Sequence, residues 1–100
     1  MMFKQVIYYF IAVVEEGSFS KAAKKYYLSQ SAISQQITKL ENDLGFLLFN
    51  RKTYYPTLTK EGKRYYQLVK KLMNDYQNEY EDLKENLKKG CFNNWNYRSF

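Results

Sequence analysis

The segment from Ser18 to Arg51 constrains the fold of this chain more than any other part of the sequence. It contains two short stretches with helical spacing, a tight turn between them and, after the second stretch, the start of a hairpin. The second stretch carries aliphatic side chains on one face and Gln and Ser side chains, rather than Glu and Lys, on the other. A helix with such an exposed face is suited to touch a polar surface at close range. In a basic chain, the edges of DNA bases are the first candidate for that surface.

Composition and charge limit the classes of protein to which the chain can belong. Its 100 residues allow one small domain with, at most, one long appended element. The 16 Lys and Arg against 10 Asp and Glu give a net charge of +6, which suits a polyanionic partner, although many small soluble proteins are mildly basic. The single cysteine, Cys91, excludes an internal disulfide, and no apolar run approaches the roughly 20 residues of a membrane span. We therefore expect a cytoplasmic protein that makes no contact with a membrane.

Two helices are expected before the turn. The first covers 3–16 and ends at Gly17. Ser18 or Ser20 can cap a short second helix, in which the small pair Ala22–Ala23 allows another helix to approach closely. The apolar residues of the first helix recur at helical spacing and form its expected core face: Val6, Ile7, Phe10, Val13 and Val14.

The third helix is expected from a cap at Ser29 to about Leu44, with Gly45 as its stop. Its core stripe consists of Ile33, Ile37, Leu40 and Leu44. The opposite face carries the polar residues Gln30, Ser31, Ser34, Gln35 and Thr38. Gln can pair with adenine through two hydrogen bonds, and Ser can reach bases or phosphates from a short stem. The alternative is an ordinary solvated face, which is usually richer in Glu and Lys.

The region 46–58 alternates loosely between apolar and polar residues around the polar centre Asn50–Thr53. Pro56 argues against a central strand but is tolerated at an edge. The simplest structure is a two-stranded wing with Arg51 and Lys52 near its tip. Cations there could lie along the DNA backbone or enter a narrow minor groove.

About the first 62 residues closely resemble the winged helix-turn-helix domain of LysR-type transcriptional regulators. The resemblance rests on Tyr9-Phe10, Glu16-Gly17-Ser18-Phe19, Ala22-Ala23, Leu28-Ser29-Gln30-Ser31-Ala32-Ile33-Ser34, Ile37, Leu40-Glu41, Leu44-Gly45, Leu48-Phe49, Arg51, Leu58-Thr59 and Gly62, all in register without a gap. It implies a mainly α fold, with three helices and a two-stranded wing followed by a long dimerisation helix, and a role in bacterial transcription control. The residues then expected to contact double-stranded DNA are Ser18, Ser20, Ser29, Gln30, Ser31, Ser34, Gln35, Thr38, Lys39, Arg51 and Lys52.

Two positions depart from the family pattern. Many members carry Pro where this chain has Ser31, and an Arg in the recognition helix where it has Gln35 or Gln36. The missing Arg would remove a strong guanine contact and one cation. We therefore expect this chain to bind DNA more weakly than members that carry the Arg, and to prefer a more A·T-rich binding site.

A long helix is expected from a cap at Thr59 to about Lys89. Its apolar residues repeat every 11 positions, or 3.67 per turn, which keeps the stripe nearly straight: Tyr65, Val69, Leu72, Tyr76, Tyr80, Leu83 and Leu87. In the family, this is the linker helix through which two subunits dimerise. The expected organisation is a DNA-binding domain over 1–58, a dimerisation helix over 59–89 and a disordered tail over 90–100.

The charges of this helix predict how two copies pair. Five cations and one anion lie between Lys60 and Met73, whereas five anions and one cation lie between Asn74 and Leu87. Antiparallel pairing sets each half against its opposite, while parallel pairing sets like against like. We therefore expect a homodimer through antiparallel linker helices, with higher oligomers left open.

The end of the chain departs from the family. The tail from Cys91 to Phe100 does not resemble the opening strand of the effector domain that follows the linker in family members. A truncation, a frameshifted end and a naturally short protein all stay open, and on this chain we expect no small-molecule effector site.

The sequence also bears on two other functional classes. An enzyme is not expected, and neither is a cofactor or a metal site, because the chain has no His, no glycine-rich phosphate loop and no cysteine cluster. The alternative to a DNA-binding regulator is a protein-interaction module, or a dominant-negative partner that acts through the dimerisation helix.

Overall fold

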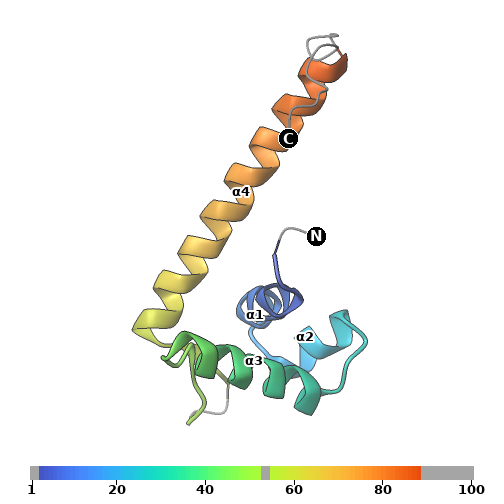
Figure 1. Ribbon diagram of the computed structural model, residues 1–100. Helices are drawn as coiled ribbons and strands as arrows, with labels where there is room; N and C mark the ends of the chain where they lie inside the picture. Colours follow the sequence, from blue (N-terminus) through green and yellow to red (C-terminus); the bar gives the residue numbers. More distant parts are fainter. Residues whose placement is uncertain (1–2, 53–54, 89–100) are drawn as a thin grey trace. The chain divides into compact units, whose positions relative to one another are not determined.

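The computed structural model describes residues 3–52 and 55–88 and has the predicted winged helix-turn-helix architecture (Figure 1). The elements in chain order are α1 (Gln5–Glu16), α2 (Phe19–Lys25), α3 (Gln30–Leu44), β1 (Phe49–Asn50), β2 (Thr57–Leu58) and α4 (Lys60–Lys88). Two compact units divide the chain, Met1–Gln67 and Leu68–Phe100, so the first unit contains α1 to α3, both strands and the first turns of α4. The predicted tail over 90–100 lies outside the described residues.

Side-chain caps begin the second and third helices. The Ser18 hydroxyl accepts a hydrogen bond from the amide of Lys21 (3.2 Å), so Ser18 rather than Ser20 is the cap of α2. The Ser29 hydroxyl accepts from the amide of Ala32 (3.1 Å) and caps α3 as predicted. Each cap satisfies one of the amides that a helix start leaves without a partner.

The buried residues of α1 differ from its predicted stripe, since Val6, Ile7 and Val14 are only half-buried. A run of four residues, Phe10 to Val13, is buried, so Ile11 and Ala12 belong to the core although the spacing did not select them. The reason is tertiary: both α2 and α3 pack on α1, and together they cover more than one face of it. Gly17 ends the helix with φ 72°, a left-handed conformation that glycine adopts without steric cost.

Aromatic rings connect the wing and the start of α4 to this core. The ring centroid of Phe10 lies 5.6 Å from that of Phe49 in β1 and 5.5 Å from that of Tyr65 in α4. The ring centroid of Phe19 in α2 lies 5.4 Å from that of Phe49. The first turns of α4 therefore pack within the first compact unit, and burial raises the pKa of the Tyr65 hydroxyl.

A buried carboxylate joins α3 to the wing. Glu41 retains 5% of its exposed surface, and its Oε2 accepts hydrogen bonds from the amides of Leu48 (2.7 Å) and Phe49 (3.2 Å). Leu48 directly precedes β1 and Phe49 begins it; β1 pairs with β2 in an antiparallel register of Phe49 with Leu58. This role could not be predicted from the sequence, because a glutamate on a mainly polar helix is usually solvated.

Thr59 fixes the start of α4 beneath the wing. Its hydroxyl accepts a hydrogen bond from the amide of Gly62 (2.9 Å) and donates one to the Leu47 carbonyl (2.6 Å), as the predicted cap. Its own amide donates to the Leu48 carbonyl (2.9 Å). None of the described helices, α4 included, combines the length and apolarity needed to cross a membrane.

Replacing Gly62 with alanine is expected to destabilise the first unit, although alanine favours helices. A methyl group at Gly62 would overlap the carbonyl oxygen of Leu48. This oxygen cannot move freely because it accepts a hydrogen bond from the amide of Thr59. Overpacking of this kind costs about 1–3 kcal/mol, more than the gain of about 1 kcal/mol in helix propensity. Urea unfolding followed by circular dichroism measures the change. Gln67→Ala, at an exposed position of the same helix, is the control and should change stability little; an equally neutral Gly62→Ala would contradict the close packing.

Candidate nucleic-acid interface

The polar face of α3 is accessible in the structure. Gln30, Ser31, Gln35 and Thr38 are exposed, and Ser34 is half-buried. These side chains come from one side of α3 because the opposite stripe, with Ile33 and Ile37 fully buried, turns toward the core. At the start of α3, the Ser29 and Ser31 hydroxyls lie 3.4 Å apart.

Arg51 lies on this face of α3. Its guanidinium donates hydrogen bonds through Nη1 to the hydroxyls of Ser34 (3.2 Å) and Thr38 (3.0 Å). Its Nη2 lies 3.5 Å from Oε1 of Glu41, and its Cζ lies 4.9 Å from the centre of the Phe19 ring. The sequence predicted Arg51 near the wing tip as a separate cation. The structure instead brings it together with two residues of the predicted reading face.

The starts of α2 and α3 also come together with the wing. A small hollow of about 220 Å³ is lined by the α2 cap Ser18, by Phe19 and Ser20 of α2, by Gln30 of α3, and by Tyr55 and Pro56. Three residues predicted to contact DNA are therefore neighbours, although ten or more positions separate the serines from the glutamine. Tyr55 is exposed beside them and was missed by the sequence reasoning, because an isolated loop tyrosine carries no recognisable signal.

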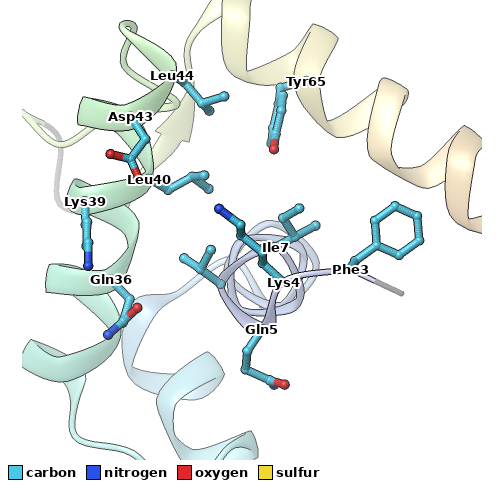
Figure 2. Close-up of a pocket in the computed structure, with 11 residues that line it drawn as sticks. Phe3, Lys4, Gln5, Ile7, Gln36, Lys39, Leu40, Asp43, Leu44 and Tyr65 are labelled. Carbon is cyan, nitrogen blue, oxygen red and sulfur yellow. The ribbon is translucent and has the colours of Figure 1, made fainter. Parts of the chain in front are cut away.

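Two predicted DNA contacts stand apart from these groups. Lys52 is exposed just after β1, where its amide donates to the side chain of Asn50 (3.1 Å). Lys39 lies on the flank of α3, on the same edge of a groove as Gln36 and Asp43 (Figure 2). The structure therefore places Lys39 away from Arg51, on the side of α3 that turns toward α1.

The groove beside Lys39 runs between α1, α3 and the first turns of α4. It encloses about 680 Å³, and Figure 2 shows Lys4, directly before α1, and Ile7 of α1 opposite the α3 side chains. Its apolar lining consists of Phe3, Val6, Ile7, Leu40, Leu44 and Tyr65. Leu44, predicted as a core residue of α3, is only half-buried because it forms part of this lining.

The apolar stripe of α4 is exposed over most of its length. Five of its seven residues keep between 42% and 48% of their exposed surface: Leu72, Tyr76, Tyr80, Leu83 and Leu87. Val69 is different, with 3% exposed, and Tyr65 packs against Phe10 and Phe46. The exposed part of this stripe therefore begins at Leu72 rather than at Tyr65.

Comparison with known proteins identifies the family. The model of the bacterial regulatory helix-turn-helix proteins of the LysR family matches residues 5–63. The HTH-type transcriptional activator AaeR of Escherichia coli (strain K12) is 42% identical over 74 residues, which are 74% of this chain and 24% of that protein. This chain belongs to the LysR family and contains its helix-turn-helix DNA-binding domain. It spans about a quarter of the length of the curated relatives that it matches.

Solved structures of DNA complexes share the fold. The crystal structure of the BenM_DBD/benA site 1 DNA complex aligns with a TM-score of 0.74 and 38% identity over 81% of this chain and 91% of that chain. The CbnR_DBD–DNA complex aligns with a TM-score of 0.71 and 30% identity, over 81% and 93%. AaeR is named a transcriptional activator and BenM a transcriptional regulator, and in both complexes the domain that resembles this chain is bound to DNA.

Proposed function

We propose that this chain binds double-stranded DNA sequence-specifically as a homodimer and acts in transcriptional regulation. The observation that carries the proposal is the exposed polar face of α3 with Arg51 held against it. This face offers side-chain amides and hydroxyls, which can read base edges, next to a guanidinium, which can bind a phosphate or a guanine. The complexes of BenM_DBD and CbnR_DBD with DNA support the same use of this fold.

Charge supports the same proposal. Residues 1–67, the first compact unit, contain ten basic and five acidic residues. Glu41 is the acidic residue nearest to the α3 face, and it is buried against the wing. The surface offered to DNA is therefore mainly neutral or cationic, which favours approach to phosphates.

The homodimer is supported by the exposed stripe of α4. Five large apolar side chains on one face of a helix form a surface that proteins seldom leave uncovered. A second copy would cover it and would carry a second α3 to the DNA. Two such helices should read half-sites one or more helical turns apart, in multiples of about 34 Å.

Salt dependence tests the proposal. Affinity for duplex DNA, measured by fluorescence anisotropy, is expected to fall about a thousandfold between 50 and 200 mM salt if a dimer contacts about six phosphates. Gln30→Ala should reduce the preference for the operator over random DNA by about 1–3 kcal/mol, while binding to random DNA changes little. Gln67→Ala, on the exposed surface of α4, is the control and should change neither the affinity for the operator nor the affinity for random DNA.

The alternative role predicts a different result. A protein-interaction module, or a dominant-negative partner acting only through α4, would bind duplex DNA weakly at every salt concentration. That outcome would refute DNA binding by this chain and leave α4 as its functional surface.

A further inference from the structure

The small hollow lined by the starts of α2 and α3 and by the wing has the chemistry of a phosphate site. Four of its side chains carry hydrogen-bond donors: Ser18, Ser20, Gln30 and Tyr55. None of the described residues that line it is acidic. Its volume of about 220 Å³ is below the roughly 300–1,000 Å³ of most small-molecule sites, so one small group fits it. Donors without a carboxylate favour an anion, since hydrogen bonds to an ionised acceptor are the strong ones.

A cation lies close to this hollow. Phe19 lines the hollow, and Cζ of Arg51 lies 4.9 Å from the centre of the Phe19 ring. The guanidinium is held there by a hydrogen bond to Thr38 (3.0 Å) and by the carboxylate of Glu41 at 3.5 Å. A phosphate in the hollow and Arg51 would therefore contact the same residue, and the attraction between their charges would act over a short distance.

We propose that this hollow binds one phosphate of the DNA backbone, which accepts hydrogen bonds from the hydroxyls of Ser20 and Tyr55. The site rests on the proposed function and adds to it a contact from the wing that carries no charge. Phosphate contacts fix the position of a protein on the duplex. Gln30, the first residue of α3, lines the same hollow, so a phosphate held there would set where the reading face meets the base edges.

The wing presents Tyr55 as a donor with little freedom. Pro56 follows it, and a following proline restricts the backbone of Tyr55 to extended conformations. A tyrosine side chain has only two rotatable bonds, so ordering it costs less entropy than ordering a lysine. The side chain keeps 65% of its surface exposed, so a backbone phosphate reaches it without any change in the core.

Removal of the Tyr55 hydroxyl tests the site. Fluorescence anisotropy measures the affinity for two duplexes of arbitrary sequence, one A·T-rich and one G·C-rich, at about 100 mM salt. Tyr55→Phe should weaken binding to both duplexes by the same factor, about tenfold, as for the loss of a hydrogen bond to a charged group. Tyr27→Phe is the matched control, because it removes the hydroxyl of a tyrosine that is 96% exposed and lies outside the hollow. It should change neither affinity.

The salt dependence separates a neutral contact from a cationic one. Tyr55→Phe removes no charge, so the slope of log affinity against log salt should stay the same although the affinity falls. Lys52→Ala removes one cation and should reduce that slope by about 1. A smaller slope for Tyr55→Phe, or a loss confined to one of the two duplexes, would contradict a hydrogen bond from this hydroxyl to the backbone.

A second variant tests whether two hydroxyls share one phosphate. Ser20→Ala leaves the α2 cap Ser18 in place and should also weaken binding to both duplexes. The loss in the double variant with Tyr55→Phe should differ from the product of the two single losses by at least about twofold, because the residues share a partner. Circular dichroism would verify that each variant is folded, and independent losses would overturn the shared site.

The outcomes separate this site from the proposed function. A chain that binds both duplexes equally well with and without the Tyr55 hydroxyl would overturn the site and leave DNA binding intact. A wild-type chain that binds neither duplex at about 50 mM salt would overturn both. Inorganic phosphate at about 10 mM and constant ionic strength should compete little, because the backbone phosphate is also held by the other contacts. Strong competition that Tyr55→Phe abolishes would assign the hollow to a free anion instead of DNA.

Discussion

Replacing Glu41 with alanine is expected to lower the free energy of unfolding by about 2–4 kcal/mol, since each buried donor left without a partner costs about 1–3 kcal/mol. The Glu41 side chain is 5% exposed and accepts hydrogen bonds from the amides of both Leu48 and Phe49. Alanine would leave these two amides without an acceptor and a cavity in place of the carboxylate. Urea unfolding followed by circular dichroism would measure the loss.

Two further variants isolate the cause. Glu41→Gln keeps one oxygen that can accept both amides but loses the charge near Arg51, so it should cost clearly less than alanine. Asp43→Ala removes an exposed carboxylate two residues away and should change stability by less than about 0.5 kcal/mol. If Glu41→Ala were as mild as Asp43→Ala, the carboxylate would not be what holds the wing on α3.

Local features of the fold could be predicted from the sequence. The caps at Ser18, Ser29 and Thr59 each depend on a hydrogen bond to an amide three residues away, so the residue types alone indicate them. The buried stripe with Ile33 and Ile37 likewise follows from spacing within one helix.

Contacts between distant residues could not be predicted. Glu41 reaches Leu48 only because the chain turns back after α3. Arg51 reaches Ser34, 17 positions earlier, only because Glu41 of α3 binds the amides of Leu48 and Phe49 shortly before Arg51. Both side chains are charged, and charged residues on a polar helix or in a hairpin are usually solvated, so hydropathy gave the opposite indication. The family resemblance identified both positions without indicating that they touch.

Arg51→Ala is expected to weaken binding to operator and random DNA alike, by about 10–100-fold, the range for hydrogen bonds to a charged group. In the structure, Nη1 of Arg51 donates hydrogen bonds to Ser34 and Thr38, and Nη2 lies near the carboxylate of Glu41. A guanidinium has five N–H donors, so several are left for a phosphate or a base. Because α3 carries no arginine of its own, Arg51 would supply the cation that its reading face lacks.

Lys52→Ala is the matched control, because it also removes one cation from the same loop. Both variants should reduce the slope of log affinity against log salt by about 1 if each side chain contacts one phosphate. Arg51→Ala should nevertheless lose more affinity, since Arg51 is held in place by α3 and Lys52 is exposed. Arg51→Lys keeps the charge without the planar fork and should fall between the two.

The coupling between Arg51 and Ser34 distinguishes a positioned side chain from a free charge. If Ser34 orients the guanidinium, the losses caused by Arg51→Ala and Ser34→Ala should not add, and the double variant should differ from their sum by at least about 0.5 kcal/mol. Circular dichroism would confirm that each variant is folded before DNA is titrated by anisotropy. Additive losses, together with equal effects of Arg51→Ala and Lys52→Ala, would mean that Arg51 acts only as a diffuse charge of the wing. In that case, the hydrogen bonds to α3 would serve stability and not recognition.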